Sequence, residues 1–122
     1  MGHVLVVDDE PQVRGMLDKL LTRAGHAVAL AEEGAQALRL LDQSDFDIII
    51  LDLLMPGMEG LETLMRLKKA HPALKVIVIS GGSRSVHMDF LPTALKLGAD
   101  RALKKPFEND ALLAAVDELL SD

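Results

Sequence analysis

The sequence contains no cysteine, no tryptophan and no tyrosine, and it has only three phenylalanines. The absence of cysteine excludes disulfides, thiolate metal ligands and cysteine nucleophiles. It fits a reducing compartment, and we expect the chain to act in the cytoplasm. The scarcity of aromatic side chains leaves few platforms on which nucleotide bases could stack.

Positive charge is scarce too: 13 Lys and Arg face 19 Asp and Glu, which gives a formal net charge of −6. We therefore expect no direct binding to nucleic acid. The apolar run Ile48–Leu51 is far shorter than the ~20 residues that span a bilayer, so no membrane segment is expected. With 122 residues, 49% of them hydrophobic, the chain is predicted to form one folded domain over residues 1–122.

Apolar runs alternate with helical patterns from end to end. Short aliphatic runs predict strands at residues 3–7, 27–31, 47–52, 75–80 and 101–104. Apolar residues at helical spacing predict helices from Pro11 to Gly25, over 34–41, from Leu61 to near His71, over about 89–97 and over 112–120. In the fourth helix we expect the inward-facing residues to be Phe90, Leu91, Ala94 and Leu95. Gly98 is expected to cap it.

The run at 47–52 is apolar without alternation, which indicates a strand buried on both faces of a parallel sheet. Strands that alternate with helices predict such a sheet with helices on both sides, joined by right-handed crossovers. Five units fit an open, doubly wound (βα)5 sheet better than an eightfold barrel.

Polar residues follow four of the predicted strands. Asp8 and Asp9 follow the first strand, Asp52 ends the third, Ser80 ends the fourth, and Lys105 follows the fifth. Ligands of open parallel sheets bind outside the carboxyl ends of the strands. We therefore expect these side chains to meet at one edge.

Carboxylates that share a pocket repel one another, and a hard cation with oxygen ligands relieves that repulsion. Mg²⁺ suits such a site, because it takes one or two carboxylates and keeps waters that a phosphate can replace. The alternative is that Asp8 and Asp9 only cap the following helix. Asp52 on a neighbouring strand argues against capping alone.

Asp52 ends an apolar run, where a carboxylate has little structural purpose. It could be a turn residue, or it could be a nucleophile that accepts a phosphoryl group. That reaction needs a metal and further donors for the phosphoryl oxygens. The Ser80 hydroxyl and the Lys105 ammonium are candidates for those donors.

The sequence resembles a receiver domain of two-component response regulators. The resemblance covers essentially the whole chain and rests on several blocks in order, namely Val6–Glu10, Asp52–Gly60, Ser80-Gly81, Gly98–Asp100 and Lys105–Phe107. It implies a flavodoxin-like α/β fold in which the five parallel strands lie in the order 2-1-3-4-5. No single block is decisive, but the combination is specific.

The resemblance also implies roles for individual residues. Asp52 is the phosphoacceptor, and Asp9 and Asp52 bind Mg²⁺ (or Mn²⁺) directly, together with the backbone carbonyl of Leu54. Asp8 binds the ion through water. Ser80 hydrogen-bonds the phosphoryl group and moves toward it on activation, while Lys105 pairs with that group.

Partners follow from the same resemblance. A sensor histidine kinase supplies the phosphoryl group, and the receiver catalyses this transfer and its own later dephosphorylation. The altered surface then binds a downstream protein target, or the phosphoryl group passes to a histidine phosphotransfer protein. Some receivers also dimerise through this surface, which makes a weak homodimer a further expectation.

One departure from the family pattern lies in the predicted fifth strand. Ala102 stands where receivers usually carry Tyr or Phe, so the usual aromatic switch is absent. Leu54 stands where aspartate-nucleophile phosphatases carry a second Asp, which argues against that enzyme class. A flavin carrier would need a Gly-rich loop in place of Asp8–Glu10. A pseudo-receiver, which binds protein without phosphorylation, stays open as the alternative.

Overall fold

The computed structural model describes residues 2–53, 59–80, 91–105 and 107–121. Its strands are β1 (His3–Val7), β2 (Ala27–Ala31), β3 (Ile48–Asp52), β4 (Lys75–Ser80) and β5 (Arg101–Lys104). Its helices are α1 (Pro11–Arg23), α2 (Gly34–Gln43), α3 (Glu59–Ala70), α4 (Leu91–Lys96) and α5 (Asn109–Ser121). Strand and helix alternate as predicted, and no helix within the described ranges is long and apolar enough to cross a membrane.

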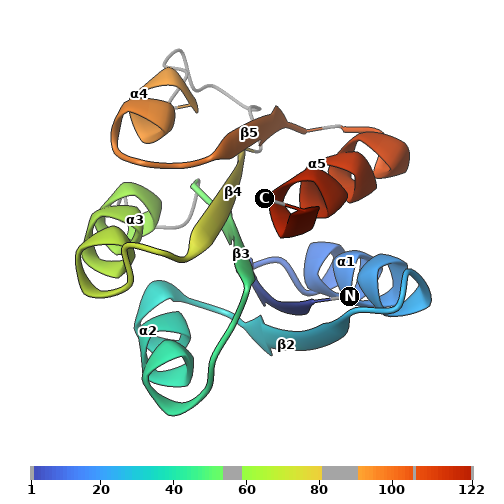
Figure 1. Cartoon of the computed structure of the whole chain (residues 1–122), viewed down its shortest axis with the longest axis horizontal. Coiled ribbons are helices and arrows are strands. Elements are labelled where there is room, and N and C mark those ends of the chain that lie inside the picture. Colours follow the sequence, from blue (N-terminus) through green and yellow to red (C-terminus); the bar gives the residue numbers. More distant parts are fainter. Residues whose placement is uncertain (1, 54–58, 81–90, 106, 122) are drawn as a thin grey trace.

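The strands form one parallel sheet of five in the order β2-β1-β3-β4-β5, which confirms the predicted fold and strand order. Helices α1 and α5 cover one face of the sheet, and α2, α3 and α4 cover the other (Figure 1). The sheet is therefore buried between two helical layers, as expected of parallel strands with crossover helices.

Each face of the sheet carries its own core. Along β1, Val4 and Val6 pack with residues of α1 and α5, while Leu5 and Val7 pack with α2 and α3. Every residue of β3 is buried. This explains why its sequence is uniformly apolar up to Asp52, since both faces are covered.

Two glycines end elements where the backbone needs positive φ. Gly25 follows α1 with φ of 97°, and Gly98 follows α4 with φ of 115°. Only glycine adopts this region without steric strain, so both residues allow the chain to turn sharply back into a strand. The predicted cap at Gly98 is confirmed.

The predicted inward face of α4 is partly wrong. Ala94 is fully buried, but Leu95 is 47% exposed. The described helix has only six residues, from Leu91 to Lys96, so periodicity over 89–97 could not fix which side faces the sheet. Phe90 and the side chain of Leu91 lie outside the described residues.

Candidate phosphorylation and metal site

The carboxyl ends of four strands place the predicted residues at one edge of the sheet. Asp52 is paired with Ile79 in the β3–β4 register, and Ser80 with Lys104 in the β4–β5 register. Asp8 follows Val7 of β1, which is paired with Leu51. The residues therefore end their strands at one level, as the parallel topology predicts.

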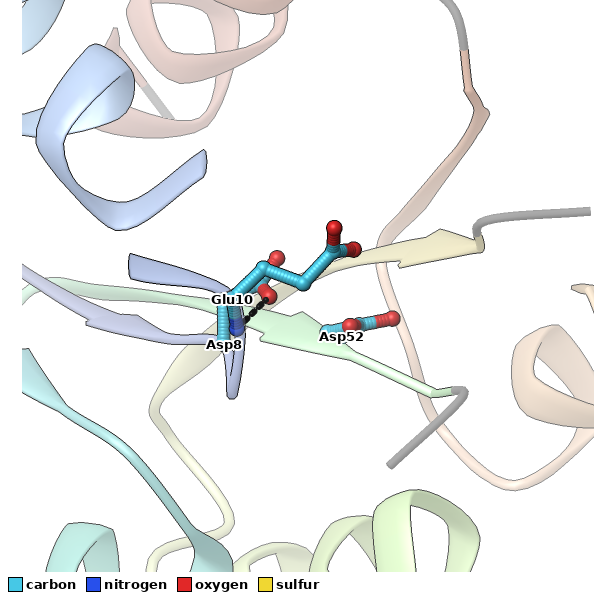
Figure 2. A group of neighbouring side chains, drawn as sticks. All are labelled: Asp8, Glu10 and Asp52. Carbon is cyan, nitrogen blue, oxygen red and sulfur yellow. Dashed lines mark hydrogen bonds between the residues drawn. The ribbon is translucent and has the colours of Figure 1, made fainter. Parts of the chain in front are cut away.

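Asp8 is fully buried, and its carboxylate is held from within its own loop. Its Oδ1 accepts a hydrogen bond of 2.9 Å from the backbone N–H of Glu10, drawn in Figure 2. The residue that caps α1 is Glu10, and α1 has no hydrogen bond from a capping side chain. Helix capping therefore does not account for Asp8 or Asp9.

Lys105 supplies the positive charge of the pocket. Its Nζ lies 3.2 Å from Asp8 Oδ2, 3.5 Å from Glu10 Oε1 and 3.8 Å from Asp52 Oδ2. The side chain is only 16% exposed, and Asp52 is buried. The ammonium thus bridges carboxylates that come from two separate strands.

The surroundings of Lys105 shift its pKa in opposing directions. Burial is the largest influence and lowers the pKa of Lys105, but the charges of Asp52, Asp8 and Glu10 and the hydrogen bond to Asp8 together outweigh burial. The pKa of Lys105 therefore lies above its ordinary value of 10.5. The ammonium form is favoured because the carboxylates of Asp52, Asp8 and Glu10 lie close to it.

Asp8, Glu10 and Asp52 each offer a carboxylate oxygen within 4.8 Å of the others. Figure 2 shows the three side chains gathered where β1 and β3 end. An Mg²⁺ ion with bonds of ~2.0–2.1 Å has an oxygen shell roughly 4 Å across. The donor set and spacing therefore suit a hard divalent cation.

Glu10 is the member of this group that sequence reasoning did not assign. It follows Asp8 and Asp9 directly, so a third acidic residue in that segment was the available signal. Among the residues that the structure describes, Asp9 is exposed and does not belong to the group. Its role as a ligand stays a prediction.

Ser80 is buried at the end of β4, and its backbone carbonyl accepts a hydrogen bond of 2.8 Å from the Lys105 N–H. This bond fixes Lys105 relative to β4. Leu54, whose carbonyl was predicted to bind the metal, lies outside the described residues. Ala102 is partly buried in β5 and is paired with Val78 of β4.

A family comparison identifies the domain type. Residues 4–117 match the model of the response regulator receiver domain. Among curated proteins, the transcriptional regulator NtrC of Escherichia coli K12 is 37% identical over 120 residues, covering 98% of this chain and 25% of NtrC. CpxR of the same strain is 36% identical, covering 98% of this chain and 50% of CpxR. The chain thus spans a quarter to a half of these relatives.

Solved receiver domains have the same structure. The receiver domain of NtrX from Brucella abortus superimposes with a TM-score of 0.89 at 31% identity, covering 97% of this chain and 98% of that one. The BeF3-activated DrrB receiver domain gives a TM-score of 0.85 at 27% identity, covering 100% and 99%. By sequence, fold and pocket, this chain belongs to the receiver domains of two-component response regulators.

Proposed function

We propose that this receiver accepts a phosphoryl group on Asp52 from a phosphohistidine of a sensor histidine kinase. The observation that carries the proposal is the buried Asp52 carboxylate, which lies at the strand edge beside Lys105 and within 4.8 Å of other acidic oxygens. A carboxylate in this position is suited to act as a nucleophile on phosphorus. Membership of the receiver family supports the same role.

The transfer is a nucleophilic substitution at phosphorus. An Asp52 oxygen forms a bond to phosphorus while the bond from phosphorus to the histidine nitrogen breaks, and the imidazole leaves with that electron pair. Lys105 contacts a phosphoryl oxygen, and the Ser80 hydroxyl donates a hydrogen bond to another. The receiver later hydrolyses the resulting acyl phosphate itself.

The resemblance assigns the ligands of Mg²⁺ or Mn²⁺ as Asp9, Asp52 and the Leu54 carbonyl, with Asp8 acting through water. When bound, the ion neutralises charge on the phosphoryl oxygens. The carboxylates of Asp8, Glu10 and Asp52 keep this edge strongly negative, which favours a divalent cation. Lys105 must give up part of its present pairing to reach the phosphoryl group.

Phosphorylation is proposed to change the surface formed by α4, β5 and α5, which then binds a protein target or a histidine phosphotransfer protein. With Ala102 in β5, no aromatic ring is available to change position there. The response would therefore depend on Ser80, which ends β4 and whose backbone carbonyl accepts a hydrogen bond from the Lys105 N–H. Phosphorylation shifts the protein from one conformation to another if the phosphoryl group interacts more favourably with the second conformation.

The test is the intact mass after incubation with acetyl phosphate, with and without Mg²⁺. We expect a Mg²⁺-dependent gain of one phosphoryl group that is lost in Asp52→Asn and kept in Asp45→Asn, an exposed acid before β3. If acetyl phosphate fails, binding of beryllofluoride in the presence of Mg²⁺ decides whether the pocket is competent. Failure of both would overturn the proposal in favour of phosphorylation-independent protein binding.

A further inference from the structure

Arg14, in the first part of α1, connects two loops at the edge of the pocket. Its Nη1 donates a hydrogen bond of 2.7 Å to the backbone carbonyl of Asp8. Its Nη2 lies 3.6 Å from Glu32 Oε1, in the connection between β2 and α2. The Arg14 side chain is only 14% exposed and that of Glu32 is 71% exposed, so the contact with Asp8 is the better shielded of the two.

The two contacts use the fork geometry of arginine. A planar guanidinium presents several N–H donors in fixed directions, whereas a lysine ammonium is a single point charge. The backbone of Glu32 is held next to the start of α2, because its N–H donates a hydrogen bond of 2.8 Å to Gln36 Oε1, whereas the Glu32 side chain is 71% exposed. The guanidinium thus holds the Asp8 carbonyl with one nitrogen and forms an ion pair with an exposed carboxylate through another.

The orientation of Asp8 matters because both its carboxylate oxygens are used. Oδ1 accepts from the Glu10 N–H, and Oδ2 lies 3.2 Å from Lys105 Nζ. The Asp8 N–H also donates to the Ala31 carbonyl at 3.2 Å. The remaining polar group of Asp8 is its backbone carbonyl, which accepts the hydrogen bond from Arg14. This bond limits movement of the Asp8 backbone and therefore of its carboxylate.

We infer that Arg14 is a positioning residue for the acidic pocket, acting through its hydrogen bond to the Asp8 backbone carbonyl. The inference rests on the proposed function, since it concerns the pocket that would bind Mg²⁺. Removing a residue that orients a direct metal ligand typically changes metal affinity by about 10–100-fold, and Arg14, which acts through the water-linked Asp8, should lie at the lower end of that range. Arg14 should therefore tune Mg²⁺ binding without touching the ion.

The sign of the effect separates positioning from simple charge. Removing a nearby positive charge alone would tighten Mg²⁺ binding, because like charges repel. Loss of positioning would weaken it. We expect Arg14→Gln to weaken Mg²⁺ binding about tenfold by isothermal titration calorimetry. The control is Arg23→Gln, a change at an exposed residue in the last turn of the same helix, which should leave affinity unchanged.

Two further variants keep the test decisive if Arg14→Gln unfolds. Arg14→Lys retains the charge but lacks the planar fork with which arginine contacts Asp8 and Glu32 through separate nitrogens, so its affinity should fall between those of wild type and Arg14→Gln. Glu32→Gln leaves the hydrogen bond from Arg14 to Asp8 in place and removes only an ion pair with an exposed carboxylate, so it should weaken binding less than Arg14→Gln does. Unchanged or tighter binding in the folded variants would overturn the inference.

A readout in metal-free protein separates this inference from the proposed function. The Glu10 amide is hydrogen-bonded to Asp8 Oδ1, so its proton chemical shift reports the orientation of Asp8. We expect Arg14→Gln to shift this resonance and Arg23→Gln to leave it unchanged. If wild type bound no Mg²⁺, the proposed function would fail, and this shift would still decide the role of Arg14.

Discussion

At the scale of single residues, Lys105 explains how several carboxylates coexist in one pocket. Asp8, Glu10 and Asp52 would repel one another, and the Lys105 ammonium lies within 3.8 Å of each. Lysine and a divalent cation therefore compete for the same oxygens. In the metal-free pocket, the Lys105 ammonium neutralises part of the negative charge of the carboxylates.

This competition gives a first prediction. Lys105→Met should tighten Mg²⁺ binding on the order of tenfold, because it removes a positive charge that repels the incoming ion. Titration calorimetry measures the change, and Lys104→Met, the exposed neighbour at the end of β5, is the matched control. Weaker binding in Lys105→Met would show that lysine organises the pocket rather than competing for it.

A second prediction concerns alkaline pH. The folded pKa of Lys105 is raised above 10.5, so its contribution to stability is complete below pH 10.5 and is lost as the pH rises through the folded pKa. The stability difference between wild type and Lys105→Met should therefore shrink above pH 10.5. Urea unfolding at several pH values measures it, and the absence of Tyr and Cys removes two other alkaline titrations.

The Lys104→Met variant provides the comparison for that experiment. Its stability difference from wild type should change little across the same pH range, since Lys104 is exposed. An equal loss in both variants would mean that the alkaline effect comes from general charge and not from the pocket.

At the scale of elements, the start of α3 packs tightly on the segment that follows Asp52. A Cβ on Gly60 would lie 2.5 Å from both the Cα and the carbonyl oxygen of Leu53. The Leu53 N–H is bonded to the Ile79 carbonyl at 2.9 Å, so this backbone cannot easily move away. Helix α3 thus sets the position of the chain directly after Asp52.

We predict that Gly60→Ala destabilises the fold by about 1–3 kcal/mol, the usual cost of overpacking. It should also slow phosphorylation of Asp52 in the acetyl phosphate assay. Gly15→Ala is the control, because a Cβ there meets nothing within 4 Å and alanine favours the interior of α1. That variant should gain about 0.5–1 kcal/mol in urea unfolding. Equal effects would contradict the packing argument.

The elements themselves were largely predictable from the sequence. Strands β1, β2, β4 and β5 match their predicted ranges, because short aliphatic runs stop at charged or glycine residues. Helix faces were harder to predict, since Met16 and Met65 share the apolar spacing yet are 43% and 49% exposed. Periodicity identifies the apolar face of a helix, but how much of that face is buried depends on the packing of the neighbouring helices.

The candidate site likewise has a part that the sequence predicts and a part that it does not. The convergence of Asp8, Asp52, Ser80 and Lys105 follows from parallel topology alone. The contributions of Glu10 and Arg14 could not be predicted, because they depend on how the loop after β1 turns into α1. Such loop geometry is set by side-chain to backbone bonds that no periodic pattern records.

At the scale of the whole molecule, the core and the pocket are separate. Two apolar clusters stabilise the fold, one on each face of the sheet, and the charged residues of the pocket lie at the strand ends or directly after them. Metal binding should therefore add to stability without rearranging the core. A ligand that binds only the folded state contributes about 2.7 kcal/mol at 100 times its Kd.

This linkage can decide which acidic residues hold the ion. Saturating Mg²⁺ should raise the Tm of wild type by about 3–5 °C per kcal/mol of binding energy. Asp52→Asn and Asp9→Asn should abolish the shift if both are direct ligands, while Glu10→Gln should only reduce it. The structure gives a reason to test both residues, because Asp9 is exposed whereas Glu10 belongs to the acidic group with Asp8 and Asp52. A shift kept in Asp9→Asn and lost in Glu10→Gln would replace Asp9 with Glu10 as the ligand.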